Sequence, residues 1–214
     1  MTALWDAYNA EDSFLPFWIP FLGLWLPALA YCWREKRQFH RFYLLHNIHN
    51  IGGILLALVS IYCNDDAIFN ERVHILWSAS YFSVDLVDCG TRGDWGYSLH
   101  AVLSLTLSAC NYTIPLGRQL RMNSKGFLTE ISTPFMHLCK KTRRTSHFAL
   151  FALVYTLCRV VWIPYLGWQL HQHGLAWTVM AVIGAFYVLN LYWYVKIWKI
   201  VMEGVKGQTA KKEL

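Results

Sequence analysis

Two apolar stretches of the sequence each hold a side chain that could carry out acid–base chemistry. Asp85 lies in the stretch 73–87, and His100 lies in the stretch 97–116. An ionisable side chain at bilayer depth costs roughly 2.5–3.5 kcal/mol on insertion scales, so its presence there indicates a function or a buried partner. A carboxylate beside an imidazole orients the ring and makes it more basic, as a general base or a nucleophile requires. We therefore expect Asp85 and His100 to be the catalytic pair.

Other polar residues recur in the apolar stretches. Tyr81 lies one helical turn before Asp85, and His49 lies at the start of the stretch 48–63. Turning so many polar groups toward lipid is too costly, so we expect them to line an enclosed polar interior. The residues that we expect to bind the substrate are Tyr81, His49, Glu130, Ser132, Thr133, Arg159 and Asn190. A structural interpretation stays open, because Ser, Thr and Asn often join neighbouring helices, and Glu130 with Arg159 would form an ion pair.

The composition indicates that lipid is the solvent of these stretches. Hydrophobic residues make up 56% of the 214 residues and charged residues 15%, against about 25% charged in soluble domains. A membrane-spanning helix needs about 20 mostly apolar residues. The stretches that meet or approach this length are 14–33, 48–63, 73–87, 97–116, 125–138, 145–170 and 175–202. We therefore predict an all-α polytopic membrane protein with seven transmembrane helices. The fifth stretch contains Glu130 and Pro134, which is typical of a broken helix enclosed by other helices.

The basic residues predict the orientation of the spans. The segments 34–41, 140–144 and 206–212 hold 11 of the 19 Lys and Arg residues, and each lies next to an apolar stretch. Cytosolic loops carry an excess of Lys and Arg, so seven spans place all three segments in the cytosol. The basic residues Arg118, Arg121 and Lys125 dissent, because this scheme places their loop on the far side of the membrane. If the stretch 125–138 did not span, the tail would lie on the opposite side of the membrane. Because the charge flanks apolar stretches, we expect no nucleic-acid partner.

The last residues of the chain predict its compartment. Lys211 and Lys212 stand fourth and third from the end. They resemble the dilysine retrieval signal of endoplasmic-reticulum membrane proteins, which is read from the cytosol. We therefore expect a multi-pass protein of the endoplasmic-reticulum membrane with a cytosolic C-terminus.

The sequence lacks the motifs of metal sites and of soluble nucleotide or hydrolase chemistry. Its six cysteines show no CxxC or paired spacing. It also contains no P-loop, GxGxxG, HExxH or GxSxG. We expect no bound cofactor and no metal, and the co-substrate that would reach the polar interior from the cytosol is acyl-CoA.

The order of the polar motifs resembles a known family. The motifs are Tyr81-Phe82-x-x-Asp85, Leu99-His100, Glu130-x-Ser132-Thr133-Pro134-Phe135, Arg159-Val160-Val161-Trp162-Ile163-Pro164-Tyr165 and Asn190-x-Tyr192-Trp193. Over residues 38–205 this set resembles the TLC-domain family, the membrane fold shared by ceramide synthases and TRAM-type proteins. The resemblance implies six helices in a barrel-like bundle with a central polar cavity, preceded by one extra helix. The implied parts are a stub with the extra helix (1–37), the TLC domain (38–205) and a basic cytosolic tail (206–214).

One motif departs from the pattern of the ceramide synthases. Those enzymes use two adjacent histidines, whereas here His100 is followed by Ala101. The His-Asp-x-x-Asp element that follows in those enzymes is also missing after His100. The chain is therefore more similar to the small TLC-domain-containing proteins than to true ceramide synthases.

The resemblance implies a function in acyl-lipid or sphingolipid metabolism of the endoplasmic reticulum, and it leaves the activity open. One hypothesis is an acyl-CoA-dependent N- or O-acyltransferase. The alternative is a non-catalytic lipid-binding regulator of membrane phospholipid composition. Membrane lipids are the expected partners in both cases. A subunit of a membrane assembly, a homo-oligomer and a transporter stay open, because polar residues inside a membrane also mark conduction paths.

Overall fold

Helices and short turns make up the whole of the described chain. The computed structural model describes residues 15–34, 38–174 and 176–212, and it describes side chains over 18–34, 45–174 and 176–204. Residues 1–14 of the predicted lumenal stub and the last two residues lie outside this part, as do the side chains of Lys211 and Lys212. The described residues form no strand, so the prediction of an all-α chain is confirmed. They divide into two compact units, Met1–Ser124 and Lys125–Leu214.

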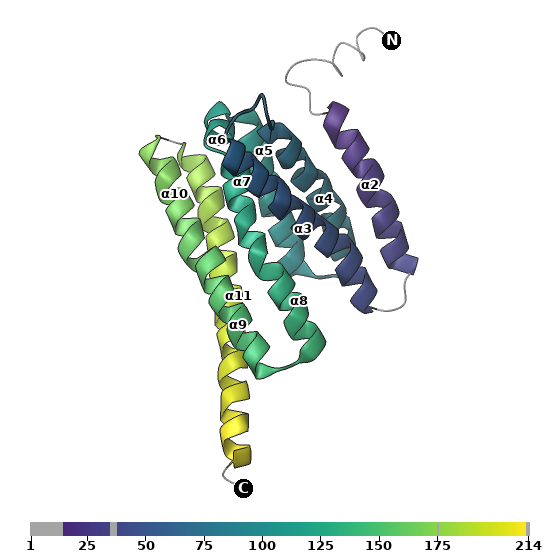
Figure 1. The fold of residues 1–214 in the computed structure, drawn as a ribbon, viewed down its shortest axis with the longest axis vertical. Helices are drawn as coiled ribbons and strands as arrows, with labels where there is room; N and C mark the ends of the chain where they lie inside the picture. Colours follow the sequence, from purple (N-terminus) through teal and green to yellow (C-terminus); the bar gives the residue numbers. More distant parts are fainter. Residues whose placement is uncertain (1–14, 35–37, 175, 213–214) are drawn as a thin grey trace. The chain divides into compact units, whose positions relative to one another are not determined.

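The first unit contains the helices that carry Asp85 and His100. Its helices are α2 (Leu15–Arg34), α3 (Gln38–Cys63), α4 (Glu71–Thr91), α5 (Trp95–Thr113), the short α6 (Pro115–Gln119) and the start of α7 (Met122–Phe127). Side-chain caps define two of the starts. Asn70 accepts a bond from the Arg72 amide at the start of α4, and Asp94 accepts one from the Tyr97 amide at the start of α5. The caps set the starts of α4, which carries Asp85, and of α5, which carries His100. Both helices are labelled in Figure 1.

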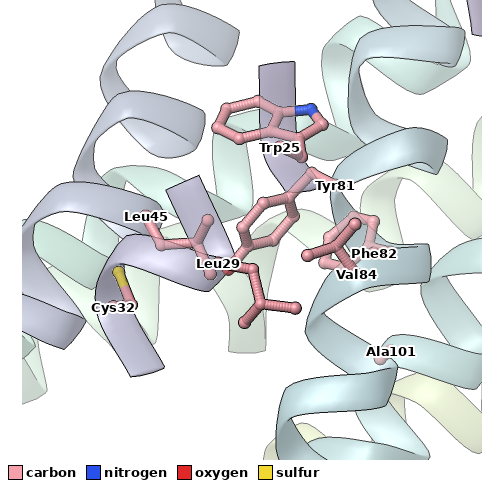
Figure 2. Close-up of a cluster of buried hydrophobic side chains, with 8 residues drawn as sticks. All are labelled: Trp25, Leu29, Cys32, Leu45, Tyr81, Phe82, Val84 and Ala101. Carbon is pink, nitrogen blue, oxygen red and sulfur yellow. The ribbon is translucent and has the colours of Figure 1, made fainter. Parts of the chain in front are cut away.

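A cluster of buried apolar side chains holds α2 and α3 against α4. Its members are Trp25, Leu29, Cys32, Leu45, Tyr81, Phe82, Val84 and Ala101 (Figure 2). The Trp25 ring is fully buried, and its centroid lies 4.8 Å from that of Trp77 and 5.4 Å from that of Tyr81. Gly52 allows the backbone of α3 to lie close to Trp77 of α4, since a Cβ at this position would be 2.9 Å from the Trp77 ring. Packing of this kind, together with hydrogen bonds, is what joins helices inside a membrane.

A second network fixes the other end of α4. Glu71 is fully buried and accepts bonds from the hydroxyls of Ser60 and Ser124 and from the Ser124 amide. The Ser124 hydroxyl also lies 2.8 Å from Nδ1 of His74, which is equally buried. The carboxyl of Glu71 is therefore turned inward and joins α3, α4 and α7.

This network makes stability depend on pH. Burial raises the pKa of the Glu71 carboxyl, although the bonds from Ser124 and Ser60 act in the opposite direction. The folded state therefore holds the proton more tightly than the unfolded chain. The stabilisation is fully present below the unfolded pKa of about 4.3 and is lost as pH rises through the folded pKa. The melting temperature of the wild type relative to that of Glu71→Gln should thus fall as the pH rises above the unfolded pKa of about 4.3. A difference between the two melting temperatures that stays constant or rises with pH would contradict this. The control is Asp65→Asn, in the exposed loop.

The second unit is built around two long helical paths. Its elements are η1 (Leu128–Ile131, a 3₁₀ helix), α8 (Ser132–Thr142), α9 (Thr145–Tyr155), η2 (Thr156–Val161, a π-helix), α10 (Trp162–Gln172) and α11 (Trp177–Lys212). α9, η2 and α10 follow one another without a break, so the predicted span 145–170 is one helical path with a π-helical middle. A π segment widens the helix locally and is frequent at functional sites. Its buried polar side chain is Arg159.

The predicted spans are confirmed as helices but not all as membrane spans. By length and composition, three helices of the described part can cross a membrane: Leu45–Cys63, Thr145–Gln172 and Trp177–Gly204. The stretch 125–138 is divided among α7, η1 and α8, which agrees with the expected broken helix. Seven spans and the central polar cavity therefore stay predictions.

Candidate functional site

Asp85 lies next to an imidazole of the neighbouring helix α3. Its Oδ1 is 4.0 Å from Nδ1 of His46, and it accepts a bond of 3.6 Å from the Cys89 thiol. The same His46 nitrogen is hydrogen-bonded to the hydroxyl of Tyr81, which lies one turn before Asp85 on α4. Asp85 and Tyr81 are buried, whereas the His46 side chain is 17% exposed. A carboxylate, an imidazole and a phenol are thus brought together in the first unit.

His49 adds a second imidazole to this group. Its ring stacks on that of Tyr81, with 3.5 Å between the centroids and 9° between the planes. Its Nδ1 lies 3.1 Å from the side-chain oxygen of Asn50. Tyr81 therefore contacts His49 through its ring and His46 through its hydroxyl. His46 is not among the residues that we predicted, although its spacing of three from His49 places both on one helical face.

His100 belongs to the same unit and is buried on α5. The rings of His100 and Phe82 pack in a T-shaped arrangement, with 5.7 Å between their centroids. The rings of Phe82 and His49 pack in the same way, with 5.2 Å between their centroids. The structure thus connects His100 to the histidines of α3 through Phe82. Asp85 lies beside the imidazole of His46. The pairing of Asp85 with His100 stays a prediction.

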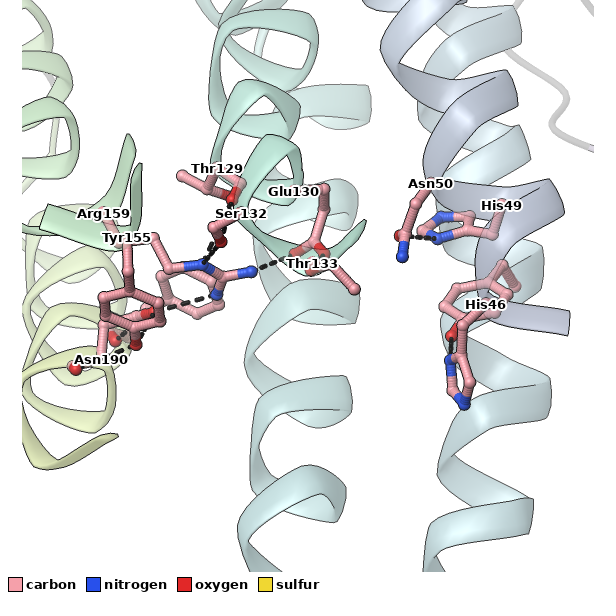
Figure 3. A network of polar contacts seen from close by, with 12 residues as sticks. His46, His49, Asn50, Thr129, Glu130, Ser132, Thr133, Tyr155, Arg159 and Asn190 are labelled. Atoms are coloured by element: carbon pink, nitrogen blue, oxygen red, sulfur yellow. Dashed lines mark hydrogen bonds and ion pairs between the residues drawn. The ribbon is translucent and has the colours of Figure 1, made fainter. Parts of the chain in front are cut away.

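In the second unit, Arg159 is the centre of a buried network. Its Nη2 donates to Oε1 of Glu130 at 2.8 Å, and its Nη1 donates to Oδ1 of Asn190 at 2.9 Å. Its Nε donates to the Ser132 hydroxyl at 3.0 Å and to the carbonyl of Thr129 at 3.2 Å. The ion pair of Arg159 with Glu130 that the sequence suggests is therefore present (Figure 3).

The partners of Arg159 are themselves bonded within the unit. The Thr133 hydroxyl donates to Oε2 of Glu130 at 2.6 Å, so both oxygens of this carboxylate accept a bond. The Tyr155 hydroxyl donates to Oδ1 of Asn190 at 3.0 Å, and Nδ2 of Asn190 donates to the Phe186 carbonyl at 2.8 Å. Glu130, Ser132, Thr133, Arg159 and Asn190 thus form one hydrogen-bonded group, which compensates the cost of burying its charges.

The described side chains of the first unit can support acid–base chemistry. Burial and the charge of Asp85 raise the pKa of the Cys89 thiol, so this cysteine stays protonated and is a poor nucleophile. Among the side chains that the structure describes, no group of three His, Cys, Asp or Glu residues could hold a metal ion. The groups that could move a proton are the imidazoles of His46, His49 and His100.

A comparison with protein families covers most of these residues. The family model of the TLC domain matches residues 64–199, which is more than half of the chain. The chain belongs to the TLC-domain family. It is therefore a membrane protein with a lipid-related function. The matched part of the TLC domain includes Asp85, His100 and the Arg159 network, whereas His46 and His49 precede it. No curated protein and no solved structure matches the chain.

Proposed function

We propose that this TLC-domain protein spans the endoplasmic-reticulum membrane seven times, with a cytosolic C-terminus, and acts in membrane lipid metabolism. Three helices that can cross a membrane support the membrane setting. The basic segments 34–41, 140–144 and 206–212 support the orientation, and the two lysines near the end support the compartment. In this proposal the last six helices enclose a polar cavity that admits a lipid head group.

The activity that the geometry supports best is transfer of an acyl group from acyl-CoA to a lipid hydroxyl or amine. The observation that carries it is the buried group of Asp85, Tyr81 and His46, with His100 connected through Phe82. Ala101 cannot supply the second imidazole of the ceramide synthases. His46 of α3 would take that place, oriented by Asp85.

The proposed step needs one base and one acid. An imidazole removes the proton of the acceptor hydroxyl or amine, whose oxygen or nitrogen attacks the thioester carbonyl carbon. A C–O or C–N bond forms and the C–S bond breaks. The proton passes through the imidazoles to the sulfur of the leaving CoA. His46 and His100 are the two groups proposed for this transfer, and Tyr81 and His49 would orient the acceptor.

The test is turnover of a labelled acyl-CoA by the purified full chain in nanodiscs that contain candidate lipid acceptors. His46→Ala and His100→Ala should each lower the rate about 100-fold or more, because general acid–base groups contribute on that scale. Ser83→Ala is the matched control on α4, since this hydroxyl donates to the carbonyl of Ala79 within its own helix. Full activity in both histidine variants would remove this group from the mechanism.

A specific observation favours a second function, that of a lipid-binding regulator of phospholipid composition without catalysis. Ala101 is fully buried within the apolar cluster of the first unit, so an apolar contact occupies the place of the second histidine. Cells that lack the protein would then have an altered phospholipid profile, which His100→Ala restores as fully as the wild type. Restoration by the wild type alone would favour the enzyme.

A further inference from the structure

The positive charge of the chain is concentrated in the second unit. Lys125–Leu214 contains 11 of the 19 Lys and Arg residues but only 3 of the 13 Asp and Glu residues. One of these acids, Glu130, is bound to Arg159 inside the unit. The remaining acids are Glu203 and Glu213, so the basic residues of this unit outnumber its acids by eight (11 against 3). An excess of this size attracts anions.

Four of these basic residues lie in the last turn of α8 and in the connection that joins it to α9. Lys140, Lys141, Arg143 and Arg144 are all exposed. The backbone beneath them is fixed, since Arg143 has a left-handed conformation (φ 53°) and its amide donates to the Cys139 carbonyl at 2.9 Å.

Side-chain and backbone bonds hold both sides of the turn. The Thr142 hydroxyl donates to the Leu138 carbonyl at 2.9 Å and lies 2.6 Å from Nδ1 of His147. The carbonyl of Arg144 accepts the amides of His147 and Phe148. The four cationic side chains therefore project from an ordered backbone. This order lowers the conformational entropy that is lost when a ligand binds.

α11 reaches the same end of the unit. A Cβ at Gly204 would lie 3.0 Å from the Thr145 side chain, so α11 passes directly beside the start of α9. Ile197 and Val201 pack in one apolar cluster with Cys139, which fixes the rotation of α11 and turns Lys199 to its opposite, exposed side.

Exposed apolar side chains adjoin this basic end. Leu150 of α9 is 42% exposed, and Ile200 and Met202 of α11 are 46% and 52% exposed. The helical path Thr145–Gln172, which begins with α9, and the part Trp177–Gly204 of α11 are each long and apolar enough to cross a membrane. The basic side chains therefore stand where the hydrocarbon region would give way to the lipid head groups.

We propose that the surface formed by Lys140, Lys141, Arg143 and Arg144 binds the phosphate-bearing head groups of anionic phospholipids. The guanidinium groups of Arg143 and Arg144 match phosphate oxygens in a bidentate manner, and the lysines add point charges. Basic residues beside a membrane each strengthen binding to anionic lipid by roughly fivefold. The apolar rim points to a lipid rather than to a free anion, because the acyl chains of the bound lipid would lie against it. This surface differs from the proposed acyl-transfer group, which lies in the first unit.

The experiment uses the full chain in nanodiscs of phosphatidylcholine with about 20% phosphatidylserine, and it counts retained lipids by native mass spectrometry. We compare the wild type with the variant K140Q/K141Q/R143Q/R144Q. The matched control is R118Q/K125Q, which removes basic residues elsewhere in the chain. Circular dichroism and elution volume verify that each variant is folded. A parallel arm adds inorganic phosphate to the wild type in phosphatidylcholine alone and measures the melting temperature.

The proposal is supported if the wild type enriches phosphatidylserine by about fivefold or more. The folded quadruple variant should lose this enrichment, and the control should retain it. The enrichment should also weaken at about 0.5 M salt, because screening shortens the reach of exposed charges. The proposal is overturned if the wild type retains both lipids equally or if the folded quadruple variant retains the enrichment. A melting temperature that rises with free phosphate, with no preference for the anionic lipid, would overturn it in favour of a soluble anion.

Discussion

Replacing Arg159 with methionine should destabilise the second unit by about 3–5 kcal/mol, the usual result of removing one partner of a buried ion pair. The substitution leaves the Glu130 carboxylate and the Asn190 carbonyl oxygen buried without their donor. It also removes the bonds from Nε that hold the turn at Ser132. The expected measurement is a melting temperature lower by roughly 10 °C in detergent.

Three further variants show whether the ion pair is the cause. Arg159→Lys should recover only part of the loss, since a single ammonium cannot reproduce the forked bonds to Glu130 and Asn190. The double variant Glu130→Gln/Arg159→Met should be more stable than Arg159→Met, because it no longer buries an unpaired charge. Arg144→Met is the control at an exposed position. Equal melting temperatures for Arg159→Met and Arg144→Met would contradict this account of the network.

Asp85→Asn should lower the rate of acyl transfer by about 100-fold or more if the proposed activity is correct. Asparagine has almost the shape of aspartate, but its neutral amide stabilises neither the orientation nor the protonated form of the His46 ring. The effect should therefore appear in the rate with little change in the amount of folded protein. Initial rates with labelled acyl-CoA measure it.

Asp88→Asn supplies the matched control for Asp85→Asn. Asp88 lies one turn further along α4, is also buried and receives bonds from Trp33 and Arg92. The two substitutions make the same chemical change in the same helix, but Asp85 lies beside His46 of α3, whereas the described bonds of Asp88 come from Trp33 and Arg92. Equal losses of activity in the two variants would point to a structural role for Asp85.

Helical spacing predicted well which faces are buried. Tyr81, Asp85 and Asp88 form one face of α4 by their spacing, and all three are buried. His100 and Ser104, one turn apart on α5, are buried as well. The reason is that exposing polar side chains to the lipid is costly, so these side chains face other helices.

The contacts between helices were harder to predict. Spacing fixes the face of a helix but not the rotation of its neighbour, so the contact of Asp85 with His46 could not be derived from the sequence. The inward turn of Glu71 depends on Ser124, which is 53 residues away in the chain. The ion pair of Glu130 with Arg159 was foreseeable because buried opposite charges require each other. The π-helical segment around Arg159 has no sequence signal that we recognise.

Cross-linking with a lipid that carries a photoreactive group at its head would test most directly whether the polar group of the first unit receives a lipid. The full chain is irradiated in nanodiscs, and the modified residues are mapped by mass spectrometry. We expect adducts at residues 46–50, 81–85 and 100, and their loss when an excess of unlabelled lipid competes. Adducts confined to the exposed apolar faces of the helices, with none at these buried residues, would contradict the account.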